Sequence, residues 1–82
     1  MKANTYKKRF RPKLEPLYFV IGRRIRSLRK QQSLTLFYIG KCAGLTPTCI
    51  ANIEAGAQRV TVHALLEIAK ALETTICDLT AE

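Results

Sequence analysis

The fold is decided by residues 36–56, which read LFYIGKCAGLTPTCIANIEAG. This segment predicts two short helices that meet at a turn. Thr35 and Thr46 each stand where a hydroxyl caps a helix N-terminus, and Pro47 suits the first turn of the second helix, because no N–H is needed there. Gly44 permits the left-handed backbone that ends a helix. The pattern is therefore helix, glycine turn, helix.

Small and apolar residues predict how these two helices pack. Gly40 leaves room for a close approach within the first helix, over residues 36–42, although a glycine there lowers helix stability by roughly 1 kcal/mol. Ile50 and Ile53 mark the buried side of the second helix, which ends at Gly56. When two short helices cross sharply, the outer face of the second projects from the body and fits a DNA major groove.

A longer helix precedes this segment. Its apolar face recurs at spacings of 4, 4 and 3 residues, at Leu17, Ile21, Ile25 and Leu28. Such spacing predicts a helix, which we expect to run from about Leu17 to Gln31 or Gln32. Residues 1–15 form a separate basic, flexible arm, and residues 16–82 form the folded domain.

Two further helices follow the segment. Thr61 caps the first of them, and its broad apolar face is typical of a central helix packed on several neighbours. This face consists of Val62, Leu65, Leu66, Ile68, Ala69 and Leu72. Thr75, with Asp78 three residues later, resembles a capping box for a short last helix. No strand alternation of convincing length occurs, so the predicted fold class is all-α, with five helices.

Charge is distributed unevenly along the chain. The net charge of the 82 residues is +8, yet the first 30 carry eleven Lys and Arg against one Glu, while the rest carry three against five acidic residues. A basic end on a mildly acidic body predicts a polyanionic partner. The arm residues expected to contact a DNA backbone are Lys8, Arg9, Arg11 and Lys13. Arg9 and Arg11 have a second possible mode of DNA binding, which is entry into the minor groove. The plainer alternative is that the arm is merely a solubilising tail.

The remaining composition narrows the class of protein. No apolar run approaches the roughly 18 residues of a membrane span, and no signal core follows the basic N-terminus, so we expect a cytoplasmic protein, nucleoid-associated in a prokaryotic or phage context. Cys42, Cys49 and Cys77 are expected to be reduced packing thiols. A metal site of these three with His63 is arithmetically possible, but the spacing is unlike that of structural zinc. We expect no cofactor and no enzymatic activity, because the chain has one His, no carboxylate cluster and no Gly-rich phosphate loop.

Positions along most of the chain follow one familiar pattern. They are Ile21-Gly22, Ile25, Leu28-Arg29, Leu34-Thr35, Ala43-Gly44-Leu45-Thr46, Ile50, Ile53-Glu54-Ala55-Gly56, Leu65-Leu66, Ile68-Ala69, Ala71-Leu72, Ile76 and Leu79. On these residues the chain resembles the Cro/repressor-type helix-turn-helix family, the five-helix phage-repressor-like domains. The resemblance implies binding to duplex DNA, usually as a dimer on a palindromic operator.

The resemblance also implies roles for single residues. Arg29 and Glu54 occupy the places of a structural ion pair that fixes the recognition helix. The base-reading positions are Pro47, Thr48 and Asn52. An Asn can bond adenine bidentately, and a Thr can offer its hydroxyl or its methyl group.

Backbone contacts to DNA are expected beside these base-reading positions. Thr46, as the cap, leaves N–H groups that point towards a phosphate, and Arg59 lies in the following loop. Leu36 stands where the family often has Gln, and Pro47 removes a polar reader. Direct readout is therefore thin, and the arm or the DNA shape is expected to contribute more than usual.

Two aromatic residues leave a question open. Phe37 and Tyr38 look exposed on the first helix of the segment. They either pack on Tyr18 or Phe19, or contact a partner protein. Dimerisation is expected from the small core and the resemblance, with the last helix, around Ile76 and Leu79, as the candidate interface.

Three functions are compatible with these features. The first is a sequence-specific double-stranded DNA-binding transcriptional regulator, a repressor that acts as a homodimer on an operator. The second is an antitoxin or adaptor that uses the same fold mainly to bind another protein. The third is an RNA-binding module in which Tyr6 and Phe10 stack on unpaired bases. The resemblance favours the first, with no membrane partner.

Overall fold

The computed structural model describes residues 16–81, which form five helices and contain no strand. They are α2 (Pro16–Gln31), α3 (Leu36–Ala43), α4 (Pro47–Glu54), α5 (Val62–Ala71) and α6 (Ile76–Thr80). The prediction of an all-α fold with five helices is confirmed. The basic arm, with Lys8, Arg9, Arg11 and Lys13, lies outside the described residues.

Threonine hydroxyls begin the last four helices. The side chains of Thr35, Thr46, Thr61 and Thr75 each accept a hydrogen bond from the backbone N–H three residues further on, at 3.0 to 3.1 Å. A cap of this kind is worth about 1 kcal/mol. At the end of α3, Gly44 has a φ of 72°, the left-handed conformation expected of a helix stop. Local chemistry therefore sets where these helices start and stop.

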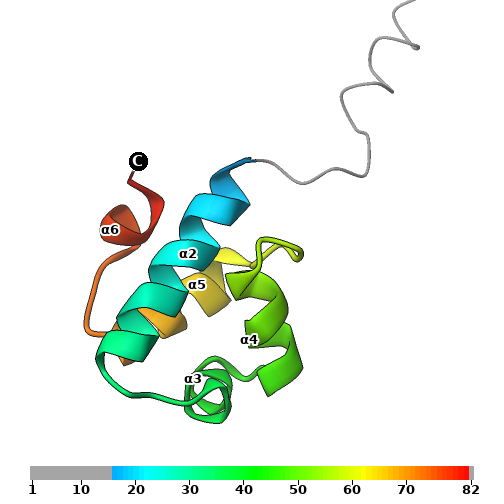
Figure 1. The fold of residues 1–82 in the computed structure, drawn as a ribbon, viewed down its shortest axis with the longest axis vertical. Coiled ribbons are helices and arrows are strands. Elements are labelled where there is room, and N and C mark those ends of the chain that lie inside the picture. Colours follow the sequence, from blue (N-terminus) through cyan, green and yellow to red (C-terminus); the bar gives the residue numbers. More distant parts are fainter. Residues whose placement is uncertain (1–15, 82) are drawn as a thin grey trace, which may run out of the picture.

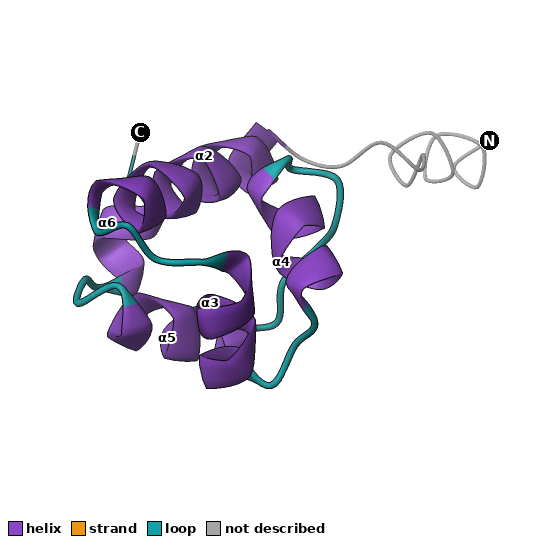
Figure 2. Ribbon diagram, turned by 60° about the horizontal axis from the view of Figure 1, so that its bottom comes forward, coloured by secondary structure: helices purple, strands orange, loops and turns teal. Residues whose placement is uncertain are grey.

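The five helices contact one another in a closed ring (Figure 2). α2 packs on α4, α4 on α3, α3 on α5, α5 on α6, and α6 returns to α2. Figure 1 shows α4 and α6 on opposite sides of the long helix α2 (Figure 1). No helix among residues 16–81 combines the length and apolar character that crossing a membrane requires.

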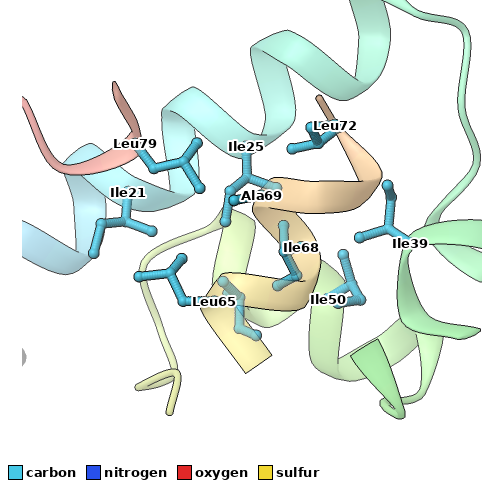
Figure 3. Close-up of a cluster of buried hydrophobic side chains, with 10 residues drawn as sticks. Ile21, Ile25, Ile39, Ile50, Leu65, Ile68, Ala69, Leu72 and Leu79 are labelled. Carbon is cyan, nitrogen blue, oxygen red and sulfur yellow. The ribbon is translucent and has the colours of Figure 1, made fainter. Parts of the chain in front are cut away.

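One apolar cluster fills the ring, and every helix contributes to it (Figure 3). Its members are Ile21, Ile25, Ile39, Ile50, Ile53, Leu65, Ile68, Ala69, Leu72 and Leu79. Seven of the larger side chains have less than 2% of their surface exposed. Within residues 16–81, no buried side-chain nitrogen or oxygen lacks a hydrogen-bond partner. The buried polar side chains around the core of the described residues are therefore satisfied.

The broad apolar face predicted for α5 is wrong at two positions. Leu65, Ile68 and Leu72 are buried, but Val62 is 75% exposed and Leu66 is 42% exposed. Because α5 is one member of a ring, only one side of it faces the core, and Val62 and Leu66 lie one turn apart outside that side. A second apolar strip of α5 is thus left on the surface.

The aromatic residues of α2 and α3 do not form one cluster. The ring of Phe19 lies against Gly56, where an added Cβ would come within 2.5 Å of it. Phe37 and Tyr38 remain 65% and 46% exposed on α3, which lies near the other end of α2 (Figure 1). Phe37 and Tyr38 are thus largely exposed, and packing on Tyr18 or Phe19, one of the two alternatives, does not bury them.

Candidate nucleic-acid interface

The outer face of α4 is the exposed half of the central two-helix unit. Ile50 and Ile53 point into the core, whereas Pro47, Thr48 and Asn52 are exposed. α4 stands at the edge of the molecule (Figure 1). The structure therefore brings the three predicted base-reading positions together on one solvent-facing surface of one helix.

Thr46 begins this helix with its hydroxyl oxygen accepting a backbone hydrogen bond. Its hydroxyl accepts a hydrogen bond from the Cys49 N–H at 3.1 Å, and Pro47 at the first position has no N–H. The first-turn donor that remains without an intrahelical partner is the N–H of Thr48. A phosphate at this helix terminus would therefore meet the backbone N–H of Thr48, and the Thr46 hydroxyl keeps its own O–H to donate.

The C-terminal end of α4 is fixed by the ion pair between Arg29 and Glu54. Arg29 Nε donates to Glu54 Oε2 at 2.6 Å and Nη2 donates to Oε1 at 3.0 Å, a bidentate arrangement. Arg29 Nη1 also donates to the carbonyl oxygen of Leu34 at 3.0 Å. The hydrogen bonds to Glu54 raise the pKa of Arg29, so this guanidinium stays charged. One arginine thus ties α4 to α2 and to the end of the loop before α3.

A second arginine stands beside the same carboxylate. Arg26 Nη1 lies 3.9 Å from Glu54 Oε1, and 57% of the Arg26 side chain is exposed, against 11% for Arg29. Since Glu54 carries a single negative charge and Arg29 already satisfies it, Arg26 adds surplus positive charge at the surface beside α4. Sequence reasoning did not single out Arg26, because its place depends on how α2 crosses α4.

Two glycines set the distance between α4 and its neighbours. At Gly22 an added Cβ would lie 2.5 Å from the carbonyl oxygen of Glu54, and at Gly40 it would lie 2.5 Å from the carbonyl oxygen of Leu45. Both are backbone atoms, which cannot swing away. The close approach predicted at Gly40 is present, and Gly22 performs the same task between α2 and the end of α4.

The loop after α4 folds back onto the helix. Gly56 has a φ of 75°, and the Ala57 N–H donates to the carbonyl oxygen of Asn52 at 2.9 Å. This is a Schellman closure, with the left-handed glycine just beyond the helix. It places Gln58 beside Asn52, whose Nδ2 donates to Gln58 Oε1 at 3.5 Å. Arg59, the next residue, is exposed.

Cys49 lies between the cap and this loop. Hydrogen bonds from Thr46 and Gln58 lower the pKa of its thiol. On α3, hydrogen bonding with the Cys42 thiol raises the pKa of the Tyr38 phenol. Among residues 16–81, all three cysteines are free and no three His, Cys, Asp or Glu side chains gather as metal ligands.

The predicted dimer interface on α6 needs a correction. Leu79 has no exposed surface, and its side chain points into the core of its own chain (Figure 3). It cannot contact a second copy there, because α6 closes the helical ring and uses Leu79 to do so. Ile76 is half-buried and packs at the margin of the same core.

The two short helices α3 and α4 are joined at a glycine turn, and α4 is anchored on its inner face and exposed on its outer face. This arrangement defines a helix-turn-helix domain. The chain belongs to this family: the family model described as "Helix-turn-helix domain" matches residues 20–81. The matched range includes α3, α4, α5 and α6 and most of α2.

Solved structures with the same fold include two of the clp gene regulator ClgR from Corynebacterium glutamicum. Both have a TM-score of 0.75 and 22% sequence identity to this chain. One match covers 82% of this chain and 71% of that protein's chain, and the other covers 83% and 87%. At this identity the likeness concerns the fold. No curated protein matches the chain.

Proposed function

We propose that this chain is a sequence-specific, double-stranded DNA-binding transcriptional regulator of the Cro/repressor type, which represses as a homodimer on an operator. The observation that carries the proposal is the contrast across α4. Its C-terminal end is held by a bidentate ion pair, while Thr48 and Asn52 stand exposed on its outer face. A rigid helix with exposed polar side chains is what major-groove readout requires.

Each exposed position has a role in this proposal. Asn52 bonds an adenine through its amide, and Thr48 bonds a base edge or places its methyl against a thymine methyl. Pro47 supplies apolar contact at the start of the helix. The backbone at Thr46 and the guanidinium of Arg59 meet phosphates, which fixes register without reading sequence.

Electrostatics supports a polyanionic partner. The surface beside α4 carries the surplus charge of Arg26, and the first 30 residues are strongly basic. We propose that residues 1–15 act as an arm beside the domain of residues 16–82, with Lys8, Arg9, Arg11 and Lys13 on the DNA backbone. Contacts of this kind release counterions, so affinity falls steeply with salt.

The dimer and the repression belong to the same proposal. A folded domain of this size has a small core, and two copies on a palindrome would place their recognition helices about 34–36 Å apart. Ile76 remains the candidate contact on α6. Repression follows from occupancy of the operator, in the cytoplasm or on the nucleoid.

A second function has one observation in its favour. Phe37 and Val62 are 65% and 75% exposed, and exposed large apolar side chains also serve protein partners. The alternative is therefore an antitoxin or adaptor that binds another protein through α3 or α5. Alanine at Phe37 and Val62 would then abolish partner binding and leave DNA binding unchanged.

Selection from random duplexes at graded salt tests the main proposal. The expected result is a preferred, palindromic motif whose affinity exceeds that for random duplex, together with weak binding to single strands. A protein that enriches no motif and binds single strands equally well contradicts it. Sedimentation with and without the selected duplex then gives the stoichiometry, which should be two chains per site.

A further inference from the structure

Gln58 is the loop residue that the chain folds onto the exposed face of α4. The Schellman closure after α4 joins the Ala57 N–H to the Asn52 carbonyl at 2.9 Å and the Gly56 N–H to the Ile53 carbonyl at 3.0 Å. These two bonds reverse the chain within a few residues. The next residue, Gln58, is half-buried, although it lies in a loop between exposed Ala57 and exposed Arg59.

The side chain of Gln58 reaches two residues one turn apart on α4. Its Oε1 accepts from Asn52 Nδ2 at 3.5 Å, and its proximity lowers the pKa of the Cys49 thiol. Asn52 itself is exposed and Cys49 is half-buried. Gln58 therefore lies along one flank of α4, beside Asn52 and Cys49.

This contact has a chemical consequence for the Asn52 amide. An Asn amide has two N–H donors on its nitrogen and one acceptor oxygen. With one N–H given to Gln58 Oε1, the oxygen and the second N–H remain free on the solvent side. Turning the Asn52 amide over would set Oδ1 against Gln58 Oε1, two acceptors face to face, so Gln58 would have to turn its own amide as well. The contact thus couples the edge that Asn52 presents to the orientation of the Gln58 amide.

We propose that Gln58 is a positioning residue for base recognition: it orients the Asn52 amide so that its oxygen and one N–H present an adenine-reading edge. The inference rests on the proposed DNA-binding function and deepens it. Adenine offers an N6 donor and an N7 acceptor in the major groove, which this edge complements. Part of the sequence preference is then set from outside the recognition helix.

Site selection with four proteins tests the coupling: wild type, Gln58→Met, Asn52→Ala and the double variant. Methionine keeps the length of the side chain and loses the amide. We expect Gln58→Met to reduce discrimination about 2- to 12-fold, the equivalent of freeing one side chain, at the same base pair that Asn52→Ala affects. In the Asn52→Ala background it should have no further effect. Independent effects, or an effect at another base pair, would overturn the proposal.

Two further variants separate orientation from other roles. Gln58→Glu keeps an acceptor at Oε1 and should retain the base preference, with all duplexes bound more weakly because of the added negative charge. Arg59→Met, in the same loop, should weaken all duplexes alike and leave every base preference unchanged. If Gln58→Met behaves like Arg59→Met, Gln58 is a phosphate contact and the proposal fails.

A measurement on the free protein keeps this inference separate from the function it rests on. Nitrogen-15 relaxation of the Asn52 side-chain amide should show restricted motion in the wild type and faster motion in Gln58→Met. Equal mobility in both proteins would overturn the proposal whatever the DNA result. If the wild type enriches no motif while the Asn52 amide is restricted, the orienting contact stands and the DNA-binding function fails.

Discussion

The inner and outer faces of α4 are held in opposite ways. On the inner face, Ile50 and Ile53 are buried in the core and both oxygens of Glu54 are bonded by Arg29. On the outer face, Thr48 is exposed, and Asn52 has one long hydrogen bond to Gln58. Under the proposed function, stability and DNA choice reside on separate faces of the same eight residues. A substitution on one face should therefore change one of these two properties and leave the other unchanged.

Loss of the Glu54 carboxylate should have the largest effect. Glu54→Ala leaves the guanidinium of Arg29, whose side chain is 11% exposed, without its partner. Breaking a buried pair in this way costs about 3–5 kcal/mol, which chemical denaturation followed by helical circular dichroism would measure. The matched control is Arg26→Ala, which removes the exposed arginine 3.9 Å from the same carboxylate and should cost less than about 1 kcal/mol. Equal losses would break the contrast between the faces.

The second largest loss of stability is expected when a side chain is added at the close approach of α2 and α4. In Gly22→Ala the new Cβ would lie 2.5 Å from the carbonyl oxygen of Glu54, so one helix must shift. Overpacking of this kind costs about 1–3 kcal/mol. Ser27→Ala, at an exposed position of the same helix, is the control and should stay within about 0.5 kcal/mol. A Gly22→Ala protein as stable as that control would show that α4 is not held at this distance.

On the outer face, Asn52→Ala should change binding and spare stability. We expect discrimination at one base pair to fall by about 1–3 kcal/mol, because one amide reads one base. The free energy of unfolding should move by less than about 0.5 kcal/mol, since the side chain is exposed. Competition between duplexes that differ at single positions would measure the first quantity. A uniform loss over all duplexes would contradict the role given to Asn52.

The smallest effect is expected at Arg59. Arg59→Ala removes an exposed charge from the loop beyond α4, so affinity for preferred and random duplexes should fall alike. The slope of log K against log salt should become shallower by about one. Titrations of both duplexes at several salt concentrations would measure this. A change confined to the preferred duplex would instead mean that Arg59 reads a base.

Much of the fold was predictable because its signals are local. A threonine cap, a proline at a first turn and a left-handed glycine act within three or four residues of themselves, and so the starts of α3, α4 and α5 follow from Thr35, Thr46 and Thr61 alone. The pairing of Arg29 with Glu54 was predicted by resemblance. The arrangement of Thr48 and Asn52 on one exposed face followed from helical spacing, while their contacts with DNA remain predictions.

The errors and omissions share a different cause. Apolar spacing shows which residues can be buried, but it does not say how much of a helix its neighbours will cover. Val62 and Leu66 were therefore expected inside and are exposed, whereas Leu79 was expected at a dimer interface and is buried. Gln58 carries no periodic signal, since its place beside Asn52 depends on a reversal of the loop.

The sequence by itself determined five helices, their caps and the glycine turn, because each of these depends on neighbours along the chain. It also determined the basic N-terminal charge, which depends on composition alone. The tertiary structure alone decided which side of α5 is covered, how closely Gly22 lets α2 approach α4, and which side chain stands beside Asn52. These depend on the closure of the helical ring, in which residues distant in the sequence compete for one enclosed volume.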